Sequence, residues 1–338
     1  MIAIVVVIYG MQSARAILVP FLVAVFLAVI CTPVMRALER IRIPTGLAVT
    51  LVVLLIIGLV TLAGMFVGGS IAEFTDRLPF YEQRLNEQLT EYAAELDQEV
   101  TVTSLLEMIQ PGAAMGLVAT LLNGLQGLFA NFFLIMFTVI FLLLEASSLP
   151  GKMQLVIRAA HGNPEYFKRF TNGVQRYLGI KTIVSMGTGL AVGLLTLAFG
   201  LDFPLLWALL AFALNYVPNI GSLIAAIPAV LLAVVQFGLM QAAMIAVGYF
   251  AINITLGGVL EPRVMGRGLG LSTLVVFLSL VFWGWVLGPV GMLLSVPLTM
   301  TAKIALEASE RTAHIALLLG SADPVSAERL YSERLSAD

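Results

Sequence analysis

The sequence predicts an all-α, polytopic integral membrane protein with broken or re-entrant helical hairpins and a small extramembrane helical cap. Of its 338 residues, 60% are hydrophobic and 11% are charged, and the mean hydropathy is +1.01. Soluble domains are about 45–50% apolar and about 25% charged. A water-soluble fold of this length has too little interior to hide so much apolar surface. The composition therefore places the chain in a membrane.

Apolar runs of bilayer length support this fold class, because about 20 helical residues at 1.5 Å rise cross a hydrocarbon core of roughly 30 Å. We expect clear spans at about 17–35, 45–70, 124–146, 178–200 and 239–259. Residues 2–9 are apolar but too few to cross alone, and no clear cleavage site follows them. They predict a first helix that is short or clipped rather than a signal peptide.

Two shorter stretches, residues 205–236 and 272–303, repeat one pattern. Each has an apolar run, a turn rich in Pro and Gly, and a second apolar run that carries its own proline, Pro228 or Pro297. Runs of this length suit half-spans or re-entrant hairpins better than independent crossings. Paired, interrupted hydrophobic segments are the best sequence pointer to a transport site, so the repeat predicts a transporter.

Basic residues orient the chain. Three lie at 36–42, six at 152–181, two at 263–267 and four from Lys303 onward. The positive-inside rule makes these segments, and with them the C-terminus, cytoplasmic. We therefore expect four regions: N-terminal transmembrane helices at 1–72, an external acidic cap at 73–112, a transport core at 113–310 with the two hairpins, and a cytoplasmic tail at 311–338.

The predicted cap holds nine of the chain's 20 carboxylates, with Arg77 and Arg84 as its cations. Four side chains recur at helical spacing: Leu85, Leu89, Tyr92 and Leu96. Ser104 and Glu107 read as a capping box that starts another short helix before Pro111. The cap is either a lid or oligomer contact, or a solvated connector whose apolar stripe rests on the membrane domain. The connector is the more common arrangement.

Several chemistries are excluded by the sequence. It has no phosphate-binding loop of the Gly-x-x-x-x-Gly-Lys-Ser/Thr type, so ATP-driven transport would need a separate subunit. His161 and His314 lie outside the expected spans and Cys31 has no partner, which leaves no metal or nucleophilic site. We expect no enzyme activity, no cofactor or metal and no nucleic-acid partner.

Polar residues at the two turns are candidates for the transport path. Asn215 and Asn219 bracket the first turn, where an amide can replace backbone hydrogen bonds lost at a proline or contact a hydroxylated solute. Asn253 lies inside an apolar run and is either a solute contact or a link between helices. The turns themselves contribute Pro218, Gly221, Gly288, Pro289 and Gly291, with Pro297 in the run that follows.

Glu261 is the leading candidate for ion coupling, because it is the sole acid between Asp202 and Glu307. Pro262 fixes the backbone between Glu261 and Arg263, which holds both charges at a defined depth. Glu145 and Lys181 are weaker candidates. We expect Lys181 to begin a Gly-rich helix and both residues to be solvated at the cytoplasmic interface, although a pairing of Glu145 with Lys181 or an arginine stays open.

Four motifs resemble the signature of the autoinducer-2 exporter (AI-2E) family. They are Asn-Tyr-Val-Pro-Asn-Ile-Gly-Ser at 215–222, Ala-Ala-Ile-Pro at 225–228, Glu-Pro-Arg-Val-Met-Gly-Arg-Gly-Leu-Gly-Leu-Ser-Thr at 261–273, and Trp-Gly-Trp-Val-Leu-Gly-Pro-Val-Gly-Met-Leu-Leu-Ser-Val-Pro-Leu at 283–298. A weaker match covers about residues 10–320.

The resemblance implies a bacterial inner-membrane protein that exports a small polar, furanone-like quorum-sensing signal and assembles as a homo-oligomer, a pentamer. It also implies that the two hairpins and the 253–263 segment are the mobile or substrate-facing parts. Two alternatives stay open. One is a cation/proton antiporter of the same family, and the other is a membrane scaffold without transport.

Overall fold

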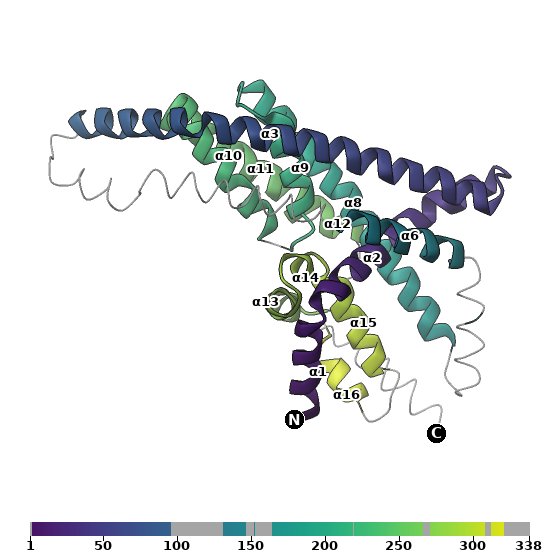
Figure 1. Cartoon of the computed structure of the whole chain (residues 1–338). Helices are drawn as coiled ribbons and strands as arrows, with labels where there is room; N and C mark the ends of the chain where they lie inside the picture. The colour runs from purple at the N-terminus through teal and green to yellow at the C-terminus, as the bar shows by residue number, and fades with distance from the viewer. Residues whose placement is uncertain are drawn as a thin grey trace.

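The computed structural model describes residues 2–95, 131–146, 152, 164–218, 220–265, 271–307 and 312–320. Its regular elements in these ranges are all helices (Figure 1). The all-α prediction is confirmed.

The N-terminal part consists of α1 (Ile2–Ser13), α2 (Arg15–Arg40), α3 (Thr45–Glu95) and α6 (Phe132–Glu145). Small and branched side chains of α2, α3 and α6 form one core cluster, which includes Ala24, Ala28, Val52, Val139 and Leu143. Alanines on α2 let its neighbours approach closely, the packing that helices in lipid rely on.

The central part runs from α8 (Pro164–Ala198) through α9 (Pro204–Leu214), α10 (Gly221–Phe237) and α11 (Leu239–Ile252). Helix α11 continues without a break as the π-helix η1 (Asn253–Leu260) and then as α12 (Glu261–Met265). Phe203 adopts a left-handed conformation, and Pro204 then starts α9 at a position where its missing N–H is harmless. Helix α8 packs along α9, and α10 packs along α11.

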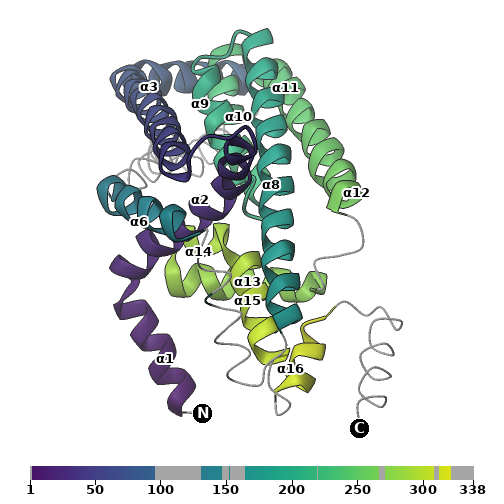
Figure 2. The ribbon, with the colours of Figure 1, turned by 90° about the vertical axis from the view of Figure 1, so that its right-hand side faces the viewer.

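The C-terminal part contains α13 (Thr273–Leu287), α14 (Pro289–Leu293), α15 (Ser295–Glu307) and α16 (Ala313–Leu318). Ser272 caps α13 by accepting a hydrogen bond from the Val275 backbone N–H at 3.2 Å. Figure 2 shows α8 running from the α9–α11 group towards α15, with which it is in contact.

Within the part of the chain that the structure describes, four helices are long and apolar enough to cross a membrane: Arg15–Arg40, Thr45–Arg84, Thr171–Ala198 and Leu239–Met265. They contain three of the five predicted spans in full and the span at 178–200 up to Ala198. The fifth, 124–146, is described from residue 131 onward, and its described part is the apolar helix α6. Much of the helix surface carries exposed large apolar side chains, as expected where lipid replaces water.

Helix α3 extends beyond the predicted span and into the region assigned to the cap. It stays continuous from Thr45 to Glu95 and lies across α9 and α10 (Figure 1). Phe74 and Tyr81 are 1% exposed and pack in the core of α9, α10 and α11. This part of the cap region therefore packs on the helical core. The predicted apolar stripe at Leu85, Leu89, Tyr92 and Leu96 lies outside the residues whose side chains are described, so the choice between a lid and a connector stays a prediction. The predicted capping box at Ser104 and the stop at Pro111 lie outside the described residues.

Both predicted hairpins are helix–turn–helix units. The first consists of α9, a turn at 215–220 and α10, and the second of α13, α14 and α15. A Cβ atom added at Gly221 would lie 1.8 Å from the Leu214 carbonyl oxygen, and one at Gly291 would lie 2.0 Å from the Trp283 carbonyl oxygen. The two turns thus share a backbone approach that glycine alone permits, which supports the repeat seen in the sequence.

Candidate functional site

A row of polar side chains runs along the buried face of α8. Lys181, Ser185 and Thr188 are spaced by four and three residues, so they share one side of the helix. Their exposed fractions are 4%, 0% and 3%. Buried polar groups need partners. Thr188 has one within α8, where it donates to the Val184 carbonyl at 2.9 Å, whereas Lys181 and Ser185 have partners on neighbouring elements.

Lys181 is matched by Glu261. Its ammonium nitrogen lies 2.8 Å from one carboxylate oxygen of Glu261 and 2.9 Å from the other. The side chains are 5% and 16% exposed, so the ion pair is largely shielded from the surroundings. The pair links the middle of α8 to the start of α12.

The position expected for Lys181 is corrected by this geometry. Helix α8 begins at Pro164, so Lys181 lies inside the helix rather than at its start. A lysine with this exposure is not solvated, and its charge is paired within the protein. Glu145 instead pairs with Lys152, with both side chains well exposed. The expected solvation is therefore wrong for Lys181, and so is the pairing of Glu145 with Lys181.

The π-helix η1 places Glu261. π-Helices are rare and occur mostly as short insertions, frequently at functional sites. This one spans eight residues and ends directly before Glu261. Within it, a Cβ atom at Gly257 would come 3.2 Å from the Asn253 side-chain oxygen, so the glycine leaves room for that amide.

The first broken turn is held to the same face of α8. The Asn215 side-chain amide donates to the Ser185 hydroxyl at 3.0 Å, and Asn215 is 5% exposed. The Tyr216 hydroxyl donates to the Thr182 hydroxyl at 2.9 Å. Two adjacent residues of the turn thus bind two neighbouring polar positions of α8.

Asn253 makes a bond between helices. Its side-chain oxygen accepts from the Ser222 hydroxyl at 2.7 Å, which joins η1 to the first turn of α10. One turn earlier, Tyr249 is 5% exposed and its hydroxyl has no hydrogen-bond partner among the described residues. The first hairpin is therefore tied to η1 as well as to α8.

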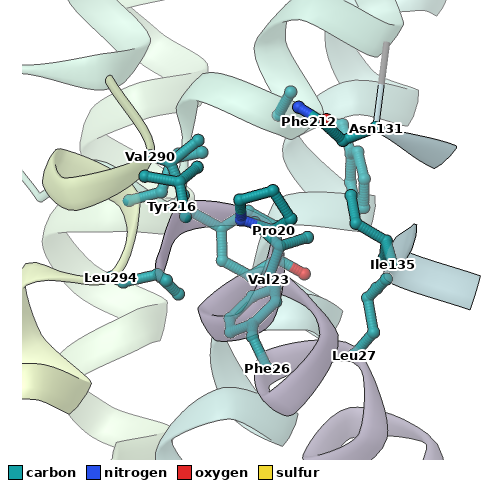
Figure 3. Close-up of a pocket in the computed structure, with 13 residues that line it drawn as sticks. Pro20, Val23, Phe26, Leu27, Asn131, Ile135, Phe212, Tyr216, Val290 and Leu294 are labelled. Carbon is teal, nitrogen blue, oxygen red and sulfur yellow. The ribbon is translucent and has the colours of Figure 1, made fainter. Parts of the chain in front are cut away.

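The second turn contributes a different surface. Gly288 has φ of +76° and ends α13, Pro289 follows as the first residue of α14, and Pro297 lies in the first turn of α15. Val290 and Leu294 of this unit line a cavity that Tyr216 also lines (Figure 3). The structure thus brings together the first turn, α8 and η1 as a polar group, whereas the second turn meets the first turn at an apolar cavity.

Three further candidates remain. Arg263 is exposed on α12 and does not join the buried group. Pro218 lies in the first turn, whereas Asn219 is outside the described residues.

The sequence reasoning missed the hydroxyl residues of the site. Thr182, Ser185, Tyr216 and Ser222 are unremarkable singly. The available signal was the recurrence of polar residues at 181, 185 and 188 within a Gly-rich apolar run, which places them on one helix face.

Comparison with known proteins identifies the family. The model of the AI-2E family transporters matches residues 1–311. The chain belongs to the AI-2E family. It is 43% identical to the AI-2 transport protein TqsA of Escherichia coli over 318 residues, which cover 93% of this chain and 92% of that protein.

Other relatives of this AI-2E family member are also named as transport proteins. A putative transport protein of Haemophilus influenzae is 40% identical over 330 residues, 95% of each chain. The putative transport protein YhhT of Escherichia coli is 36% identical over 328 residues, 96% of this chain and 94% of that one. The chain is a multi-pass membrane transporter and not an enzyme, and the family resemblance predicted from the motifs is confirmed.

Proposed function

We propose that this AI-2E family transporter exports autoinducer-2, a small polar furanone-type signal. One observation carries the proposal: a buried polar row on α8 is hydrogen-bonded to the broken turn at 215–220 and ion-paired to Glu261. The name of the Escherichia coli relative, an AI-2 transport protein, supports the choice of substrate.

The polar row suits a hydroxylated solute. In an apolar surrounding, a solute hydroxyl that leaves water needs donors and acceptors. Ser185, Thr182 and Asn215 supply both, and each is bonded to a neutral partner that a solute hydroxyl can replace. The N-terminus of α10 has no side-chain cap, so its backbone N–H groups add donors at the same turn.

Alternating access is the mechanism we infer from this arrangement. The two hairpins and the 253–263 segment move as the substrate-facing unit against the remaining spans. The bonds that tie the first hairpin to α8 and η1 are few and mostly neutral, so they can exchange during the movement. Glycines at the α8–α9 contact allow the close approach that sliding requires, since a Cβ atom at Gly189 would lie 2.8 Å from the Ala208 carbonyl oxygen.

Without an ATP site, export runs down the solute gradient or is driven by an ion, and Glu261 is the group that we assign to ion coupling in the second case. Protonation of Glu261 removes its charge and leaves the buried Lys181 ammonium without a counter-ion. A proton that binds there therefore destabilises the contact between α8 and α12. Proton binding and the release of this contact are linked in the same site.

The same ion pair argues against the cation/proton antiporter. Lys181 already contacts both carboxylate oxygens of Glu261, so a metal cation would have to displace a tethered ammonium. A bare cation also prefers several oxygen ligands of high charge.

The resemblance and the charge pattern supply the remaining parts of the proposal. We place the protein in the bacterial inner membrane with its C-terminus cytoplasmic, region 73–112 outside and region 311–338 inside. Region 113–310 forms the transport core, whose hairpins re-enter the membrane rather than cross it. The protein assembles as a homo-oligomer, and the family resemblance implies a pentamer.

The experiment is the ratio of internal to external autoinducer-2 in cells that lack their own exporter, with and without this protein. A lower ratio that depends on the intact protein supports export. An unchanged ratio with normal membrane insertion contradicts it, and sodium-dependent proton flux by the purified protein would then favour the antiporter. The control variant is Glu145→Gln, which removes a carboxylate from an exposed ion pair and should give the same ratio as the wild-type protein.

A further inference from the structure

A cavity of about 270 Å³ lies between the N-terminal helices and the turns of both hairpins (Figure 3). One face of α2 forms its floor through Val19, Pro20, Val23, Phe26 and Leu27. The remaining walls come from α6, from the end of α9 with the first turn, and from α14 with Leu294: Asn131, Ile135, Phe212, Ala213, Tyr216, Val290, Leu293 and Leu294.

The walls of this cavity are almost entirely hydrocarbon. Asn131 and Tyr216 are its polar side chains, and the Tyr216 hydroxyl is bonded to Thr182 on α8. A buried water needs two to four polar partners, whereas apolar cavities of roughly 150 Å³ stay dry and accept benzene. A hydroxylated solute would also lose hydrogen bonds here. The cavity therefore suits neither water nor a polar cargo.

The position of the cavity along α2 indicates the source of the occupant. Val19 to Leu27 extend from near one end of the 26-residue span to its middle, between Arg15 and the arginines at 36–42. In a helix that crosses a bilayer, these residues lie within or beside the hydrocarbon layer. Exposed aromatic side chains lie near lining residues in the sequence: Phe21, 47% exposed, follows Pro20, and Phe133, 78% exposed, comes two residues before Ile135. We therefore expect hydrocarbon chains of the bilayer to border this part of the protein.

We propose that the cavity binds the end of a membrane-lipid acyl chain, held between α2 and the turns of both hairpins. Transfer of a chain from lipid gains little from the hydrophobic effect, since lipid tails are as apolar as the walls. The gain comes instead from dispersion contacts with wall atoms that would otherwise face a void. The claim does not depend on which solute the protein carries.

A lipid chain bound in the cavity would contact the turns of both hairpins and α2 at once. Tyr216 belongs to the turn that binds α8, and Val290 belongs to the second turn, so both turns touch the bound chain. Movement of either hairpin relative to α2 changes the volume available to the chain.

The test uses purified protein in vesicles of phosphatidylethanolamine and phosphatidylglycerol that contain a phospholipid with a photoactivatable diazirine at the end of one acyl chain. After illumination, mass spectrometry maps adducts residue by residue. We expect adducts on the cavity-facing residues Val23 and Phe26, beside the ordinary adducts on exposed residues of α13 such as Leu274 and Phe277.

Two variants change the cavity in opposite directions. Ala213→Phe places a ring in the space and should lower the adduct yield at Val23 and Phe26, relative to that on α13, by about fivefold because close-packed atoms exclude the chain. Phe212→Ala enlarges the cavity and should raise the relative adduct yield at Val23 and Phe26. Ala251→Phe, on an exposed position of α11, is the matched control and should leave that yield unchanged.

The proposal is overturned if Val23 and Phe26 carry no adducts in the wild-type protein, or if Ala213→Phe leaves their relative yield unaltered in a protein that still reconstitutes. Either result can be obtained whether or not the vesicles transport autoinducer-2, so failure here is distinct from failure of the proposed function.

Discussion

The ammonium of Lys181 lies 2.8 and 2.9 Å from the two carboxylate oxygens of Glu261, across 80 positions of the sequence. With side chains 5% and 16% exposed, each charge depends on the other for its stabilisation. Removal of one partner from such a pair leaves an uncompensated buried charge, whereas replacement of both is often nearly neutral. We propose this asymmetry as the basis of the ion coupling that we assign to Glu261.

Removing the Lys181 charge alone should destabilise the protein more than removing both charges of the pair. We expect Lys181→Met to lower the free energy of unfolding by about 3–5 kcal/mol. Lys181→Met combined with Glu261→Gln should lose much less, so the double-mutant cycle gives a strong favourable coupling. Thermal unfolding of the purified proteins measures this. Lys152→Met, which breaks the exposed pair with Glu145, should cost at most about 1 kcal/mol; equal losses for Lys181→Met and Lys152→Met would contradict the buried pair.

The two turns should tolerate no side chain at their crossing glycines. Gly221→Ala places a methyl group 1.8 Å from the Leu214 carbonyl oxygen, and Gly291→Ala places one 2.0 Å from the Trp283 carbonyl oxygen. Each turn must therefore open. We expect loss of transport and reduced thermal stability for both variants. Gly58→Ala is the control, because nothing lies within 4 Å of the added atom in α3. A wild-type rate for either turn variant would show that the close approach has no role.

The bond between Asn215 and Ser185 should couple the first turn to α8. Asn215→Leu and Ser185→Ala each remove one partner of a buried hydrogen bond. Hydrogen bonds between membrane helices are worth about 0.6 kcal/mol on average and up to about 1.7. We predict a coupling energy in that range from a double-mutant cycle, together with slower autoinducer-2 export by each single variant. Additive effects on stability would argue that the two side chains act independently.

A polar cluster should fasten the far part of α3 to the central helices. The Tyr81 hydroxyl donates to Asp202 at 2.9 Å, Arg77 contacts the same carboxylate oxygen at 3.3 Å, and the Trp207 indole donates to the Asp202 carbonyl at 2.7 Å. Tyr81→Phe should cost about 1 kcal/mol and should speed hydrogen exchange in α3 beyond Phe74. Tyr9→Phe, at a tyrosine 72% exposed, is the control. Unchanged exchange in the Tyr81 variant would contradict the docking role.

Most of the fold follows from the sequence because lipid imposes a simple rule. A segment that crosses hydrocarbon has to satisfy its own backbone hydrogen bonds, so apolar runs of sufficient length become helices. The predicted spans at 17–35, 45–70 and 239–259 lie in long helices, and the one at 178–200 does so up to Ala198. The two repeated turns were also visible, since glycine and proline mark positions where a helix cannot continue.

The contacts of the site were harder to predict, because they depend on which helix faces meet. Lys181 and Glu261 were each selected singly, yet their pairing requires α8 to pack against η1 and α12. The π-helix that orients Glu261 has no signal in the apolar pattern of residues 253–260. The start of α8 at Pro164 was missed because its first residues are polar, which hid the helical continuity before Lys181.

The most direct test of the central claim is autoinducer-2 efflux from proteoliposomes that contain the purified protein, with and without an imposed proton gradient, for the wild-type protein and Glu261→Gln. We predict efflux above that of protein-free vesicles, accelerated by the gradient in the wild type and insensitive to it in the variant. No efflux above protein-free vesicles would contradict export of this solute. Efflux that responds to the gradient equally in both proteins would remove Glu261 from the coupling mechanism.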